Sequence, residues 1–148
     1  MVRRIEITLG EAIAEAELME GDAPKSSRQI LDLLPIEGKP FHTLESGREI
    51  FLPIPLEKKI IPENQTIHQI PGDILLYYKP AIYVEPEWPE IKRQIAVIGL
   101  CYGRDTQIKG LYMPLPVNIV GKMVEGLEQL EEEAIRLRNT GLEKMMIT

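Results

Sequence analysis

Apolar and polar residues alternate along the start of the chain, with the period of two that is typical of half-buried β-strands. The alternation covers residues 5–9 and again 12–18, and Gly10 and Glu11 lie between the two segments. Glycine in the first position suits a two-residue hairpin turn. This turn sets a register in which all apolar pairs share one face: Leu9 with Ala12, Ile7 with Ala14 and Ile5 with Ala16,.

Two segments have the helical period instead. Ser26 followed by Gln29 matches a capping box, and the apolar residues that follow end at Pro35, which predicts a short helix over residues 26–34,. Residues 127–141 carry apolar positions at helical spacing, glutamates early and arginines late, which complements the helix dipole,. Gly141 is the expected stop of this second helix,.

Short apolar segments between the helices predict further strands over residues 41–44, 49–52, 74–78, 95–102 and 117–124,. Prolines mark the remainder as edges and loops, notably the long loops 80–94 and 103–116,. About seven or eight strands with one early short helix and one C-terminal helix favour a mainly β fold, a closed or nearly closed β-barrel. The expected core consists of Ile5, Ile7, Leu9, Leu31, Leu34, Ile74, Leu76, Val97, Leu100, Ile119 and Val120.

Length, charge and cysteine usage narrow the class of protein. The 148 residues fit one domain, residues 1–148, in which the helix at about 127–141 forms a C-terminal extension,. A net charge of −6 argues against nucleic acid as a partner,. The single cysteine allows no internal disulfide, and the longest apolar run, 95–102, is far shorter than the roughly 20 residues of a membrane span,. We therefore expect a cytoplasmic protein that does not interact with membranes.

The run VGKMVEGLE at 120–128 resembles the late strand and turn of the cyclophilins, where a Gly-Lys-Val-x-Glu-Gly pattern precedes a short helix. The opening hairpin, the early helix, the Phe41-His42 pair and the Gly72-Asp73 turn occur in the cyclophilin order. The pieces LLPIEG at 33–38 and PVNIVG at 116–121 look more like a small prokaryotic cyclophilin-like family whose activity is not established. The resemblance covers most of the chain and implies a cyclophilin-like barrel with a binding groove.

One departure from the cyclophilin pattern bears on catalysis. The resemblance implies an arginine directly after Phe41-His42, but Thr43 stands there, and the cyclophilin Gln-Gly-Gly-Asp run is missing from the sequence. Prolyl isomerisation would then need Arg48 or Arg104 to take over the electrostatic role.

The remaining reactive residue types do not form a recognisable catalytic set. Two lone histidines, His42 and His68, with one cysteine lack the spacing of a metal site, and no Gly-rich phosphate loop occurs, so we expect neither a metal nor a cofactor,. Cys101 lies in an apolar strand and is expected to be a small buried hydrophobe,.

Three functions remain open. The first is a binding domain whose groove takes a small molecule or an extended peptide, with these candidate ligand-binding residues: His42, Tyr78, Trp88, Tyr102 and Arg104,. The second is a divergent, weak peptidyl-prolyl cis-trans isomerase, and the third is a non-catalytic subunit that acts with a protein partner. We expect the pocket between loops 80–94 and 103–116, and a monomer, although the C-terminal helix and residues 145–147 offer an interface,.

Overall fold

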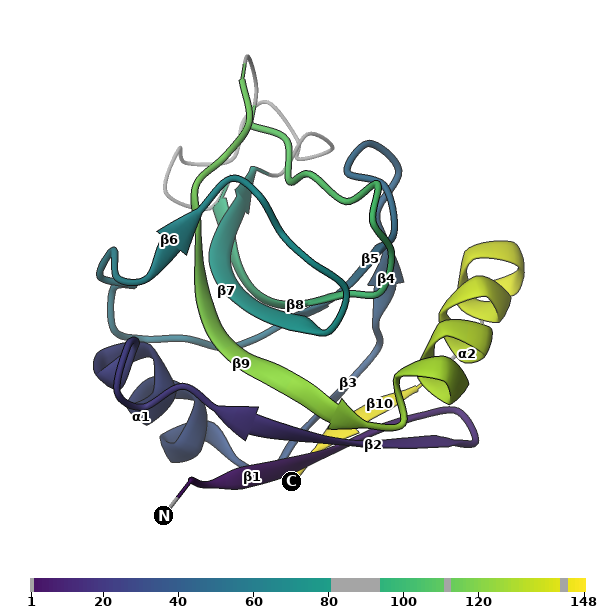
Figure 1. Ribbon diagram of the computed structural model, residues 1–148, viewed down its shortest axis with the longest axis horizontal. Helices are drawn as coiled ribbons and strands as arrows, with labels where there is room; N and C mark the ends of the chain where they lie inside the picture. The colour runs from purple at the N-terminus through teal and green to yellow at the C-terminus, as the bar shows by residue number, and fades with distance from the viewer. Residues whose placement is uncertain (1, 81–93, 111–112, 142–143) are drawn as a thin grey trace.

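Ten strands and two helices make up the part of the chain that the computed structural model describes, residues 2–80, 94–110, 113–141 and 144–148 (Figure 1). The elements follow the chain as β1 (Arg4–Leu9), β2 (Ala12–Leu18), α1 (Pro24–Leu33), β3 (Ile36–Gly38), β4 (Phe41–His42), β5 (Glu49–Pro53), β6 (Gln65–Thr66), β7 (Asp73–Pro80), β8 (Gln94–Cys101), β9 (Val117–Glu125), α2 (Leu127–Thr140) and β10 (Met145–Ile147).

The strands form one antiparallel sheet that curls into a nearly closed barrel. Its order is β3-β10-β1-β2-β9-β7-β8-β5-β4, and β6 pairs with β9 beside this path. The two ends of the path, β3 and β4, are consecutive in the chain, with only Lys39 and Pro40 between them. The chain itself, and not a hydrogen-bonded ladder, therefore joins the two edges of the sheet. The prediction of a mainly β, nearly closed barrel with two helices is confirmed.

The opening hairpin has the register that the alternation predicts. Leu9 pairs with Ala12, Ile7 with Ala14 and Ile5 with Ala16. Gly10 has a φ of 56°, as the two-residue turn requires,. On the outer face Arg4 bonds to Glu15 at 3.1 Å and to Glu17 at 3.3 Å, which offsets the Glu6–Glu15 pairing,.

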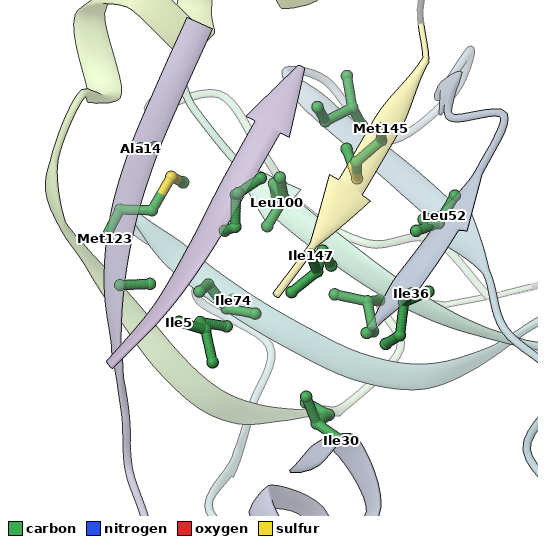
Figure 2. Close-up of a cluster of buried hydrophobic side chains, with 14 of the residues drawn as sticks. Ile5, Ala14, Ile30, Ile36, Leu52, Ile74, Leu100, Met123, Met145 and Ile147 are labelled. Carbon is green, nitrogen blue, oxygen red and sulfur yellow. The ribbon is translucent and has the colours of Figure 1, made fainter. Parts of the chain in front are cut away.

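The core fills the inside of the barrel. Side chains from opposite parts of the sheet meet there, among them Ile74, Leu100 and Met123 with Ile147 of the last strand (Figure 2). Most of the expected core residues are buried, but Leu31 and Leu34 are only half-buried and pack against the edge of the cluster. A second, smaller cluster lies on the other face of the sheet, where Ile108 and Leu115 cover Leu75 and Tyr77.

The predicted capping box at the first helix is wrong. The helix begins at Pro24, whose fixed φ suits the first turn, so Ser26 lies inside it and is buried,. Its backbone N–H donates to Glu63 Oε1 at 2.6 Å, and its hydroxyl accepts from Asn118 Nδ2 at 2.9 Å. A carboxylate distant in sequence therefore satisfies this end of the helix.

Residues 145–147 form a strand inside the sheet. β10 pairs with β1 on one side and with β3 on the other, and Met145 and Ile147 are buried. Both backbone edges of the tail are therefore paired within the sheet, and its use as an interface stays a prediction. The second helix has the predicted bounds, and Gly141 ends it at a φ of 69°. Among the described helices, none is long and apolar enough to cross a bilayer.

Candidate functional site

Two loops that follow different strands are fastened together at one end of the barrel. Gln107 N–H donates to Ser46 O at 3.0 Å, and Lys109 N–H donates to Ser46 Oγ at 3.1 Å. Gly47 has a φ of 84°, and a Cβ built on it would lie 2.3 Å from Asp105 O. Only glycine allows this approach, which fixes residues 46–48 against residues 103–109.

Arg48 is held at this junction by its backbone and by its side chain. Its carbonyl accepts from Tyr102 N–H at 3.0 Å and from Thr106 Oγ1 at 3.0 Å. Its side chain lies on Gly103, where a Cβ would come within 2.2 Å of Arg48 Cδ. The absence of a side chain at Gly103 therefore gives Arg48 its place beside Tyr102.

A hollow of about 510 Å³ opens where this junction meets the start of α2. The loops contribute Arg48, Gly103, Arg104 and Asp105, Tyr102 lies at the end of β8, and Pro71 precedes β7; α2 contributes Leu127, Glu128 and Glu131. The hollow therefore combines a tyrosine and two apolar side chains with charges of both signs.

The two arginines of the hollow differ in their partners. Arg48 Nε lies 3.5 Å from Asp105 Oδ1, and both side chains are more than half exposed, so this pair contributes little to stability,. Arg104 is exposed and forms no ion pair within the described part of the chain. The guanidinium of Arg104 is therefore available to an anionic group.

Behind the hollow, the side chains of Tyr102 and His42 are joined by a hydrogen bond. His42 Nδ1 lies 2.7 Å from the carbonyl oxygen of Thr43, which can only accept, so Nδ1 carries the proton,. Burial lowers the pKa of His42, so the ring is neutral and Nε2 accepts the Tyr102 hydroxyl proton at 2.5 Å. Burial also raises the pKa of Tyr102. Tyr102 is thus a fixed neutral wall of the hollow.

The structure separates the other candidates from this hollow. Tyr78 lies on the inner face of β7, packs against the core, and its hydroxyl accepts from Ile60 N–H at 3.1 Å. Cys101 is buried and burial raises the pKa of its thiol to about 11, which agrees with the expected inert role,. Trp88 and most of the loop 80–94 lie outside the described residues.

Sequence reasoning missed a buried acid on the outer face of the sheet. Tyr77 O–H donates to Glu49 Oε2 at 2.5 Å, and the carboxylate reaches it across Gly99 of β8, where a Cβ would lie 2.5 Å from Oε2. Glu49 Oε1 has no hydrogen-bond partner among the residues that the structure describes. Burial raises the pKa of Glu49 to about 7, although Lys79 and the Tyr77 hydrogen bond oppose the shift. The available signal was a glutamate beside the apolar positions 50–52.

The described residues contain no cluster of three or more histidine, cysteine, aspartate or glutamate side chains that could hold a metal ion.

Solved structures with the same architecture have low sequence identity to this chain. McbB in complex with tryptophan matches with a TM-score of 0.67 and 16% identity, over 97% of this chain and 43% of McbB. The solution structure of a hypothetical protein from Archaeoglobus fulgidus gives 0.59 and 21%, over 99% and 93% of the two chains. A cyclophilin-type peptidyl-prolyl cis-trans isomerase from Cryptosporidium parvum gives 0.57 and 16%, over 100% and 97%. The fold is therefore cyclophilin-like.

Sequence comparison agrees with the resemblance noted above. The profile of a family described as "protein of unknown function (DUF3830)" matches residues 5–148, which is nearly the whole chain. No curated protein matches the sequence significantly. The chain spans less than half of McbB, so the similarity to that protein concerns the fold alone.

Proposed function

We propose that this chain, which belongs to the DUF3830 family of proteins of unknown function, is a binding domain whose hollow beside Tyr102 takes a small zwitterionic molecule. Arg104 receives the carboxylate of the ligand, together with Arg48 once it is released from Asp105, and Glu128 or Glu131 receives a cationic group,. The side chain of Leu127, beside the nearly buried Tyr102, contacts the apolar part of the ligand,.

The observation that carries this proposal is the convergence of two arginines and two helix glutamates on one hollow. Its volume of about 510 Å³ falls within the roughly 300–1,000 Å³ of small-molecule pockets,. Arg104 forms no ion pair with a described carboxylate, which supports recognition of a ligand carboxylate, because guanidinium–carboxylate pairs are directional and charge-assisted,. McbB, whose barrel resembles this one, was solved with tryptophan, itself a zwitterion, and this supports an amino acid as the first probe.

Three probes that differ only in charge test the proposal. Tryptophan carries both charges, indole-3-propionate lacks the ammonium group and tryptamine lacks the carboxylate. Titration followed by backbone amide NMR shifts is expected to give the tightest binding for tryptophan, with the largest shifts at residues 102–105 and 127–131. Equal binding of all three probes would show that the hollow does not distinguish ligands by their charge. Shifts confined to other residues would show that the probes bind elsewhere.

Replacing Arg104 by alanine is expected to weaken tryptophan binding by about tenfold, which corresponds to the loss of one partly screened charged hydrogen bond. Tryptamine binding should not weaken, because it has no carboxylate. Arg3→Ala is the matched control, since Arg3 is an exposed arginine that pairs with Glu20 and does not line the hollow. Calorimetric titration of both variants measures the effect, and equal losses in the two would contradict it.

Prolyl isomerase activity is expected to be absent or very weak. Thr43 occupies the position where the cyclophilin resemblance implies an arginine, and its side chain is buried and uncharged. Acceleration requires groups that hold the transition state more tightly than the bound substrate. A protease-coupled assay on a proline peptide is the measurement. Turnover like that of the cyclophilins, abolished by Arg48→Ala or Arg104→Ala, would contradict this expectation and favour the isomerase.

A further inference from the structure

The helix α1 lies on the side of the barrel away from α2 (Figure 1). Two hollows, of about 370 Å³ and about 430 Å³, lie between α1 and the segment that follows β5. They share Gln29, Asp32 and Lys58 in their linings, so they adjoin. We call this pair of hollows the α1 groove.

One end of the α1 groove is strongly basic. Lys25 and Arg28 of α1 and Lys58 and Lys59 of the facing segment line the first hollow, against Asp32 as its single carboxylate. All four cations are exposed, and none forms an ion pair with a described carboxylate. In a chain of net charge −6, this local excess of positive charge favours an anionic group,.

The other end of the α1 groove adds three apolar side chains to the lining. Leu33, Pro55 and Leu56 line the second hollow, with Glu57 as an added carboxylate. Leu33 and Leu56 pack against the main core with part of their surface and turn the rest to the groove. A ligand that fills both hollows therefore needs an apolar body beyond its anionic group.

The segment facing α1 is held in place, so the groove is preformed. Gln29 Nε2 donates to the carbonyl oxygens of Lys58 at 3.2 Å and Lys59 at 3.1 Å. The next residue, Ile60, is buried and donates its N–H to Tyr78 Oη at 3.1 Å. The two lysines thus stand on a backbone that is anchored to both α1 and β7, which reduces the ordering entropy that binding requires.

We propose that the α1 groove binds an anionic amphiphile, a molecule with a carboxylate or phosphate head on an aliphatic chain. The head lies among Lys25, Arg28, Lys58 and Lys59, and the chain lies along Leu33 and Leu56 toward Pro55. This site shares no lining residue with the hollow beside Tyr102, so each proposal can be tested independently of the other.

The test uses octanoate and octyl phosphate as probes, with octanol and octyltrimethylammonium as neutral and cationic counterparts. Backbone amide shifts on the full chain are expected to move at residues 24–33 and 55–61 with both anions. Acetate and inorganic phosphate should bind much more weakly, because each buried methylene tightens binding by up to about fourfold. The two head groups distinguish a carboxylate from a phosphate ligand, and preference for either supports the site.

Charge reversal supplies the matched variants. Lys58→Glu with Lys59→Glu is expected to weaken octanoate binding by ~10-fold or more, since two cations of the head site become repulsive. Lys109→Glu with Lys122→Glu changes the net charge equally at exposed lysines outside the groove and should leave binding unchanged. The neutral pair Lys58→Gln with Lys59→Gln gives an intermediate loss and guards against a folding defect, which circular dichroism would reveal.

Several results would overturn the proposal. If octanol bound as tightly as octanoate, the groove would not recognise the anionic head group. If acetate bound as tightly as octanoate, the groove would not recognise the aliphatic chain. Shifts centred on Arg104 instead of α1, equal losses in the two charge-reversed pairs, or no binding of either anion would each refute the site.

Discussion

The wild-type protein is expected to gain about 3 kcal/mol of stability from Glu49 as the pH falls from about 7 to 4.5, and Glu49→Gln is expected to remove this gain,. The cause is the burial of Glu49 beside Tyr77, which raises the pKa of its carboxyl to about 7 from the ordinary 4.5. The folded state then binds the proton more tightly than the unfolded chain does. The contribution is fully present below pH 4.5 and is lost as the pH rises through about 7,.

Other groups titrate in or near the same range. Burial raises the pKa of Asp73, which acts in the same direction as Glu49, whereas burial lowers the pKa of His42, which removes stability as the pH falls,. The difference between wild type and Glu49→Gln cancels both contributions. Glutamine keeps the shape of the side chain and can still accept the Tyr77 hydroxyl proton, so the variant should fold.

Urea unfolding at a series of pH values measures the expected difference, provided that the transitions are two-state. Glu6→Gln serves as the control, because Glu6 is an exposed carboxylate on β1, and its profile should run parallel to that of wild type. The decisive quantity is the difference in free energy of unfolding between the wild type and Glu49→Gln. If this difference stayed constant between pH 4.5 and 7, Glu49 would not be buried as the structure places it.

Replacing Gly47 by alanine is expected to destabilise the protein by about 3 kcal/mol or more. A left-handed backbone conformation costs an alanine about 1–2 kcal/mol, and the new methyl group would collide with the carbonyl of Asp105,. Because Gly47 fastens the loop of Arg48 to that of Arg104, the variant should also lose tryptophan binding. Thermal or urea unfolding, followed by the probe titration, measures both effects.

Two other glycines separate the contributions at Gly47. Gly141 has a φ of 69° with no atom of the described residues within 4 Å of a built Cβ, so Gly141→Ala is expected to report mainly the backbone strain. Gly21 has neither a positive φ nor a nearby atom, and Gly21→Ala should be neutral. If Gly47→Ala were no more destabilising than Gly141→Ala, the close approach of the two loops would be refuted.

The elements that sequence predicted correctly are those whose signals are local. The hairpin register follows from a two-residue turn and an alternation that permits one pairing only, as Ile7 and Ala14 illustrate. The second helix has its stop at Gly141 and its charges in its own turns,. These features depend on residues that are close together in the sequence, so the local sequence pattern is enough to predict them.

The errors involve partners that lie far away in the chain. Ser26 has the sequence of a cap, but Glu63 satisfies its N–H and Asn118 bonds to its hydroxyl, so neither contact can be read from residues 23–30. Met145–Ile147 is too short to give a strand signal, and its neighbours are β1 and β3. In both cases tertiary contacts decide the structure.

In the candidate site, too, some features could be predicted from the sequence and others depend on contacts between distant residues. Tyr102, Arg48 and Arg104 were named from residue type and resemblance, and the structure places all three around one hollow. The part played by α2 could not be predicted, because only the folded barrel brings the first turns of the helix to Tyr102. Strand alternation could separate Tyr77 from Tyr78, but it could not show that Tyr77 meets Glu49 across an intervening strand.

The position of β10 also has a consequence for the kinetics of folding. Ile7 pairs with Ile147, and Ile36 pairs with Ile147 from the other side, so the first, third and last strands of the chain meet in one ladder. Pairings between such distant residues raise the contact order, which slows the formation of antiparallel barrels. Until β10 docks, β1 and β3 present open edges to other chains. A chain in which β10 has not docked is therefore more prone to aggregate than the folded barrel,.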